Sequence, residues 1–99
     1  MVVATLTLDA LLGDVHSLKQ KRAVVRPILA QLRRRFEVAA AETGAQDLHR
    51  RAELAVAVVT STHAHAVEML EECERFVAGR PEIELLSARR RVLDDDDLD

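Results

Sequence analysis

Four cationic side chains in the first half of the chain have the spacing of a single helix face. They are Lys19, Arg22, Arg26 and Arg33. On an α-helix these positions fall within about 60° of one another, so the side chains would form one continuous basic strip. Such a strip can follow a nucleic-acid backbone and neutralise successive phosphates, which makes binding steeply salt-dependent. Further arginines at positions 34, 35, 50 and 51 would widen it.

The alternative interpretation of the same cations is an ordinary solvated helix face. Their long stems would then cover apolar surface while the charged ends pair with carboxylates of a neighbouring helix. The second half of the chain offers such carboxylates at Glu68, Glu71, Glu72 and Glu74. The residues alone leave both interpretations open.

Residues suited to catalysis or metal binding are few and poorly grouped. His16 and Ser17 are a base and a nucleophile in neighbouring positions, which rarely hold a productive geometry, and no orienting acid is evident. Near a helix start, His63 and His65 would point about 200° apart, which disfavours a shared metal. The lone Cys73 is expected as a small buried apolar residue. We therefore expect a non-enzymatic protein without metal or cofactor.

Length and composition indicate one small globular domain. The chain has 99 residues, of which 48% are hydrophobic and only 2% aromatic, so aliphatic side chains must fill the core. No apolar run is long enough to span a membrane, and we expect a soluble, cytoplasmic protein without membrane contact. Residues 1–51 carry nine Lys or Arg and five Asp or Glu, a net of +4, whereas residues 52–99 carry five and twelve, a net of −7.

The elements that would position the basic strip alternate along the chain. Ser17 and Gln20 have capping-box spacing, which starts a helix near Leu18, and apolar side chains within an arc of about 60° extend it to Phe36, with a kink at Pro27. Strands are expected at 2–12, 37–42, 52–61 and 83–93, a turn at 43–51, and a second helix from about residue 62 to Gly79. The strand at 52–61 reads as buried on both faces.

This order predicts an α+β, ferredoxin-like β-α-β-β-α-β domain over residues 1–93, with a four-stranded antiparallel sheet and two helices on one face. Residues 94–99, DDDDLD, are expected to be an acidic, disordered tail. The sheet's second face would carry small or apolar residues at 5, 7, 55, 57 and 59, which a solvated face seldom collects. A homodimer is therefore expected, with a small-ligand groove between subunits as a sharper alternative.

Three segments resemble the YlxP family of small bacterial proteins of unknown function. They are SLKQKRAVV at 17–25, FEVAAAE at 36–42, and Asp47-Leu48 followed by RAELAVAVV at 51–59. The resemblance implies a ferredoxin-like fold, and genes of such relatives often lie beside those for transcription and translation factors, including the ribosome-binding factor RbfA. It implies no catalytic residue. The chain departs from the family pattern at His49, where relatives commonly have an aromatic residue, usually Trp.

Together these observations favour a binding module that associates with RNA or a ribonucleoprotein through its first helix. Base stacking on the sheet is not expected, because the two aromatic residues, Phe36 and Phe76, fall on the predicted helices. The alternative from a different class is a homodimeric small-ligand-binding or regulatory module that does not bind nucleic acid.

Overall fold

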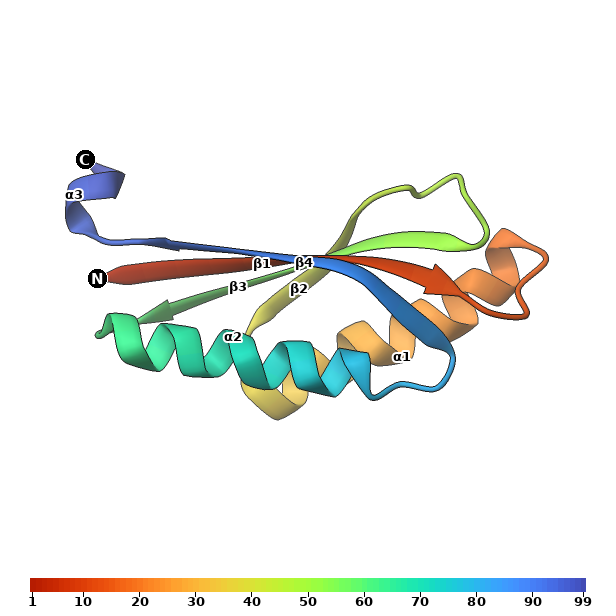
Figure 1. Ribbon diagram of the computed structural model, residues 1–99, viewed down its shortest axis with the longest axis horizontal. Helices are drawn as coiled ribbons and strands as arrows, with labels where there is room; N and C mark the ends of the chain where they lie inside the picture. Colours follow the sequence, from red (N-terminus) through yellow and green to blue (C-terminus); the bar gives the residue numbers. More distant parts are fainter.

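The computed structural model describes residues 1–99 and has the predicted element order. The elements are β1 (Val2–Leu12), α1 (Leu18–Phe36), β2 (Ala39–Gly44), β3 (Arg51–Thr60), α2 (His63–Ala78), β4 (Ile83–Leu93) and the single turn α3 (Asp95–Leu98). The four strands form one antiparallel sheet in the order β2-β3-β1-β4. Both long helices lie on the same side of this sheet (Figure 1), so the ferredoxin-like α+β prediction is confirmed.

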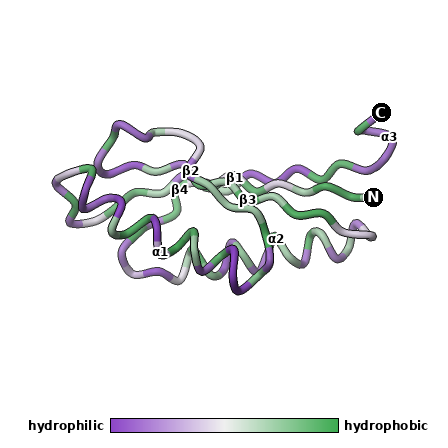
Figure 2. The backbone as a smooth tube through the Cα atoms, turned by 180° about the vertical axis from the view of Figure 1, so that it is seen from behind, coloured by the Kyte–Doolittle hydropathy of each residue, from purple (hydrophilic) through white to green (hydrophobic).

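The core lies between the helices and the inner face of the sheet. In β1 the even-numbered residues from Val2 to Leu12 are buried and the odd-numbered ones are half-buried, which is the alternation of a strand covered on one side only. Buried apolar residues of β1, β2, β3 and both helices make up this layer, and Ile83, Leu85 and Val92 of β4 pack against it. Figure 2 shows hydrophobic stretches along β1 and β3. The core is aliphatic apart from one cysteine, as the composition requires.

One face of the sheet is uncovered, which corrects the prediction for β3. Ala52, Leu54, Val56 and Val58 are buried, but Ala55 and Ala57 are only half-buried and Val59 is 66% exposed. The sequence suggested burial on both faces because alanine and valine suit either environment. In this antiparallel sheet both helices pack on one side, and no element of the chain covers the other.

Helix α1 begins where the capping residues predict. The Ser17 hydroxyl accepts a hydrogen bond from the Gln20 amide at 3.1 Å, and the Gln20 side chain accepts one from the His16 amide at 2.6 Å. The helix continues through Pro27 without a break. The kink at this proline stays a prediction.

Strand β2 starts two residues later than predicted, because the chain must first leave α1. Glu37 closes the helix in the left-handed region, with φ of 54°, and this turn is incompatible with a strand beginning at residue 37. Val38 is then buried and β2 runs from Ala39 to Gly44. At its far end a register irregularity between Glu42 and Gly44 leads into the β2–β3 hairpin.

Helix α2 is capped by Thr62, whose hydroxyl accepts from the His65 amide at 3.2 Å. Gly79 ends it in a right-handed conformation, with φ of −80°, so the stop does not depend on the left-handed freedom of glycine. Two of the four glutamates of α2 contact β4: Glu71 and Glu74 lie 3.4 and 3.8 Å from the Arg90 guanidinium. The expected pairing of acidic α2 with basic α1 is therefore wrong, since no ion pair joins the two helices.

The acidic C-terminal segment forms one helical turn in the structure. Asp94 and Asp97 make a capping box around α3, and Asp95 lies 3.0 Å from the N-terminal ammonium of Met1. This turn occupies part of the segment at 94–99 for which the sequence predicts disorder, and its side chains are exposed.

Candidate functional site

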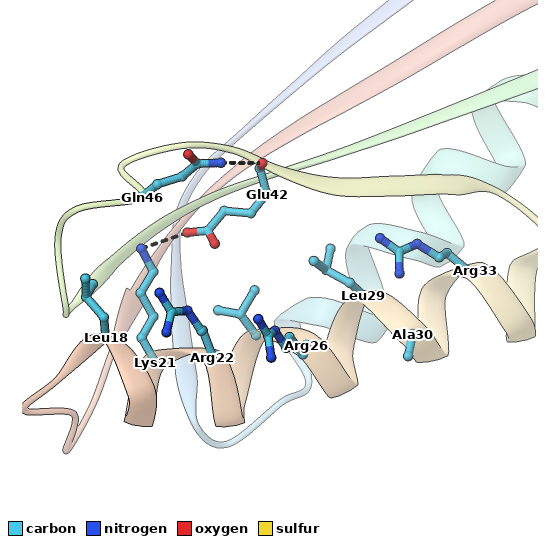
Figure 3. A pocket seen from close by; sticks show the side chains of 10 residues that line it. Leu18, Lys21, Arg22, Arg26, Leu29, Ala30, Arg33, Glu42 and Gln46 are labelled. Atoms are coloured by element: carbon cyan, nitrogen blue, oxygen red, sulfur yellow. Dashed lines mark hydrogen bonds and ion pairs between the residues drawn. The ribbon is translucent and has the colours of Figure 1, made fainter.

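Three of the four predicted cations form an exposed row on α1. Lys19, Arg22 and Arg26 are exposed, and none has a carboxylate of the same chain within ion-pair distance. Arg22 and Arg26 stand one turn apart along the helix (Figure 3). Their positive charge is therefore uncompensated inside the protein, in contrast to Arg90 on β4.

Arg33 belongs to the same helix face but already has a backbone partner. Its Nε and Nη2 atoms donate to the Ala40 carbonyl oxygen at 3.0 and 2.6 Å. Ala40 lies on β2, whose other side pairs with β3, so this carbonyl faces the free edge of the sheet. Arg33 thus occupies one of the unpaired carbonyls of an edge strand. Three of the four predicted cations remain without a partner in the protein.

The further arginines suggested from the sequence do not extend the row as one surface. Arg35 lies over the Phe36 and Phe76 rings, 5.5 Å from each centroid. Arg50 donates through Nε to the Leu12 carbonyl at 3.1 Å. Arg51 pairs in register with Leu11, on the side of the sheet away from the helices. Arg34 is exposed and has no hydrogen bond or ion pair.

A groove of about 620 Å³ runs beside the row, between α1 and the start of the β2–β3 hairpin. Its lining residues are Leu18, Lys21, Arg22, Val25, Arg26, Leu29, Ala30, Arg33, Glu42 and Gln46. Apolar side chains of α1 form its floor, arginines form its rim, and Glu42 and Gln46 face them from the hairpin side (Figure 3).

Sequence reasoning missed the residue that ties this groove together. Lys21 falls in the middle of the apolar face of α1, and its side chain is only 3% exposed. Its ammonium donates to the Ala45 carbonyl at 2.7 Å and lies 2.7 Å from Glu42 Oε2. The signal was available, because a lysine among apolar positions at helical spacing requires a buried acceptor. Its partner on another element could not be read from the sequence.

The Glu42 carboxylate keeps most of its hydrogen-bonding capacity. Oε2 is buried, and its polar contact in the protein is the Lys21 ammonium at 2.7 Å. The other oxygen, Oε1, makes no hydrogen bond or ion pair with the protein. A carboxylate can accept several hydrogen bonds, and this one is turned toward α1 (Figure 3).

The remaining candidate residues are not gathered into one site. His16 Nε2 lies 2.7 Å from Asp14 Oδ1, but both side chains are largely exposed and Ser17 serves as a helix cap. His63 and His65 lie in the first turn of α2, and no three His, Cys, Asp or Glu side chains gather as a metal site would require. Cys73 is fully buried, as predicted.

Fold and surface together describe a small ferredoxin-like protein with one exposed cationic row beside a groove. A family model described as "Protein of unknown function (DUF503)" matches residues 3–90. The chain is also similar to "Uncharacterized protein YlxP" from Bacillus subtilis (strain 168), with 34% identity over 76 residues, which covers 77% of this chain and 83% of that protein. The chain therefore belongs to the DUF503 family, and the predicted resemblance is confirmed. No helix of the structure has the length and apolar character needed to span a membrane.

Proposed function

We propose that this protein is a non-enzymatic RNA-binding module that contacts RNA or a ribonucleoprotein through α1. The observation that supports the proposal is the row of Lys19, Arg22 and Arg26, which is exposed, continuous on one helix face and unpaired with any carboxylate. Cations held by neighbouring carboxylates gain little from a phosphate, whereas unpaired ones release counterions from RNA on binding. Two of the four α2 glutamates, Glu71 and Glu74, pair with Arg90 of β4, and none of the four forms an ion pair with the row.

The test compares two pairs of arginines that carry the same charge. Replacing Arg22 and Arg26 by Ala should weaken binding to ribosomal RNA by about 10- to 100-fold at moderate salt and lower the salt slope by about 1.5. Replacing Arg51 and Arg91 by Ala removes two exposed arginines from the opposite sheet face and should change affinity little. Fluorescence anisotropy titrations at several salt concentrations measure both quantities.

Either of two results would contradict this function. If both double variants lose affinity equally, binding reflects total charge and not the α1 row. If the Arg22 and Arg26 variant keeps its affinity and salt slope, RNA does not contact α1.

The uncovered sheet face supports a second proposal, that two copies of the chain associate through it. Across β1 and β3 this face carries Thr5 beside Ala57 and Thr7 beside Ala55, and alanines of β2 continue both rows. On β4 the same rows end in Arg91 and Arg89. The side chains of this face are therefore short on the β2 side and long on the β4 side. A two-fold axis parallel to the strands would place the long side chains of each copy over the short side chains of the other.

The size of this face sets the strength expected of the dimer. Four strands spaced by about 4.8 Å, each contributing about eight residues of 3.3 Å, give roughly 500 Å² per copy. That lies below the area of a standard stable interface, so dissociation in the micromolar range is expected. Sedimentation velocity between about 1 and 100 µM tests it, and a monomer throughout that range contradicts it. In that case a small ligand or another protein would have to cover the face.

A further inference from the structure

We infer that the groove between α1 and the β2–β3 hairpin holds one unpaired nucleotide, with its phosphate at Arg22 and Arg26 and its base on the apolar floor. The base would present an amino group to the free oxygen of Glu42. This inference rests on the proposed RNA-binding function and adds the class of ligand that the site recognises: a single-stranded nucleotide whose base carries an exocyclic amine.

The groove has the dimensions and walls that such a ligand needs. Its volume of about 620 Å³ is within the range of small-molecule sites, which is about 300 to 1,000 Å³. Arg22 and Arg26 stand on its rim, where a phosphate remains partly hydrated. Val25 and Leu29 contribute apolar lining. A phosphate alone would use the rim and leave the floor exposed to water. The combination of cations with an apolar floor suits a ligand that has both an anionic and a flat apolar part.

Glu42 gives the groove a preference among bases. Its Oε2 faces the Lys21 ammonium at 2.7 Å, while Oε1 has no partner in the protein. A carboxylate accepts hydrogen bonds and donates none, so it favours a base edge with an amino group over one with a carbonyl. Cytosine and uracil differ at this point, with a 4-amino group in the first and a 4-oxo group in the second.

A groove beside a free strand edge could also bind a peptide, which would add a strand to β2. The edge of β2 is not available for this pairing. The outward carbonyls of Ala40 and Glu42 already accept hydrogen bonds from the side chains of Arg33 and Gln46. A peptide strand would have to break both contacts before it could pair with β2. The groove is therefore closed on its strand side and open along the cationic rim.

Two substitutions of alanine on α1 separate the groove from the cationic row. Both alanines are exposed and lie two turns apart on the same face of α1. Ala30 lines the groove, whereas Ala23 lies outside it, beside Arg22 and Arg26. Ala30→Phe should fill the groove and weaken binding of a cytidine heptamer by about tenfold, while Ala23→Phe should change it by less than about twofold. Both variants keep every charge, and their thermal unfolding confirms that the fold is intact.

A third variant tests the base preference. The wild-type protein should bind the cytidine heptamer about five- to tenfold more tightly than the uridine heptamer. In Glu42→Gln the amide oxygen must face the Lys21 ammonium, which turns the amide nitrogen, a donor, toward the groove. The preference should then reverse in favour of uridine, an outcome that a merely weakened fold would not produce.

The outcomes distinguish this inference from the function on which it rests. Equal effects of Ala30→Phe and Ala23→Phe, or equal affinity for the two heptamers in wild type and Glu42→Gln, would overturn the nucleotide groove while RNA binding by α1 stands. Absence of binding to either heptamer and to ribosomal RNA would overturn both. Cytidine monophosphate serves as a competitor, and competition as strong as that of the heptamer would assign the groove to a free nucleotide instead of RNA.

Discussion

At the scale of single residues, two arginines of the same helix face have different tasks. Arg26 is exposed and unpaired, whereas Arg33 donates two hydrogen bonds to the Ala40 carbonyl at the free edge of β2. Charge and helical spacing are identical for both, and only the position of β2 separates them. Sequence reasoning could place Arg33 on the strip but could not show that a strand edge lies beside its guanidinium.

Arg33→Ala should therefore reduce stability more than it reduces RNA affinity. Losing a charge-assisted hydrogen bond at a partly exposed carbonyl costs about 1 to 2 kcal/mol in the free energy of unfolding. Arg34→Ala, which removes a neighbouring exposed arginine with no hydrogen bond, should cost less than about 0.5 kcal/mol. Urea unfolding of the two variants measures the difference, and equal stabilities would show that the Ala40 contact contributes nothing.

Cys73 offers a prediction about reactivity. Burial, with a smaller contribution from nearby Glu72, raises the pKa of its thiol from 9.0 to about 11. The thiolate fraction at pH 8 is then roughly 100-fold lower than for an ordinary cysteine, so a thiol reagent should react only after denaturant is added. The folded state retains the proton longer than the unfolded state, so this residue's contribution to stability is complete below pH 9 and is lost between about pH 9 and 11.

The matched comparison for Cys73 is the same reagent at pH 8 in native buffer and in denaturing urea. Rapid labelling in native buffer would mean that the thiol opens to solvent without global unfolding. That result would contradict its place in the packed face of α2.

At the scale of elements, an ion pair between buried Lys21 and half-buried Glu42 fastens α1 to β2. Lys21 comes from the first turns of the helix and Glu42 from the last residues of the strand, and Lys21 also holds the Ala45 carbonyl. The contact fixes the groove wall relative to the cationic row.

Replacing one residue of this ion pair should cost more free energy of unfolding than replacing both. Lys21→Met leaves the half-buried Glu42 carboxylate without a counter-charge and should lower the free energy of unfolding by about 2 kcal/mol. Adding Glu42→Gln to that variant removes the stranded charge and should restore about 1 to 2 kcal/mol. A double-mutant cycle by urea unfolding measures the coupling, and strictly additive losses would show that the pair does not act as a unit.

The sequence predicted the positions of helices and strands better than it predicted how these elements pack against one another. Periodicity and caps located β1, both helices and β4 closely, because Ser17, Thr62 and the alternating apolar residues act locally. Strand β2 shifted because the left-handed turn at Glu37 is set by the exit from α1. The exposure of β3 on one face depends on where both helices pack, which is a property of the assembled sheet.

At the scale of the whole molecule, the two faces of the sheet offer separate surfaces. Both helices cover one face (Figure 1), and α1 carries the cationic row on that side. The small residues of β1, β2 and β3 lie on the other face. RNA binding at α1 and association of two copies through the bare face are therefore sterically compatible. A dimer would carry two α1 rows on its outer sides.

The last prediction concerns this bare face. Ala57 lies near its centre, flanked in register by Thr5 and Ala39, so Ala57→Arg should place a charge and a long side chain between two stacked sheets. The dissociation constant of the dimer should rise at least tenfold, since a buried unpaired charge opposes association. Ala78→Arg makes the same charge change at an exposed position at the end of α2 and should leave the monomer–dimer equilibrium unchanged. Sedimentation velocity resolves the two, and equal dimerisation of both variants would mean that the copies meet elsewhere. RNA affinity measured in parallel should stay the same per protomer, because Ala57 lies on the face opposite to Arg22 and Arg26.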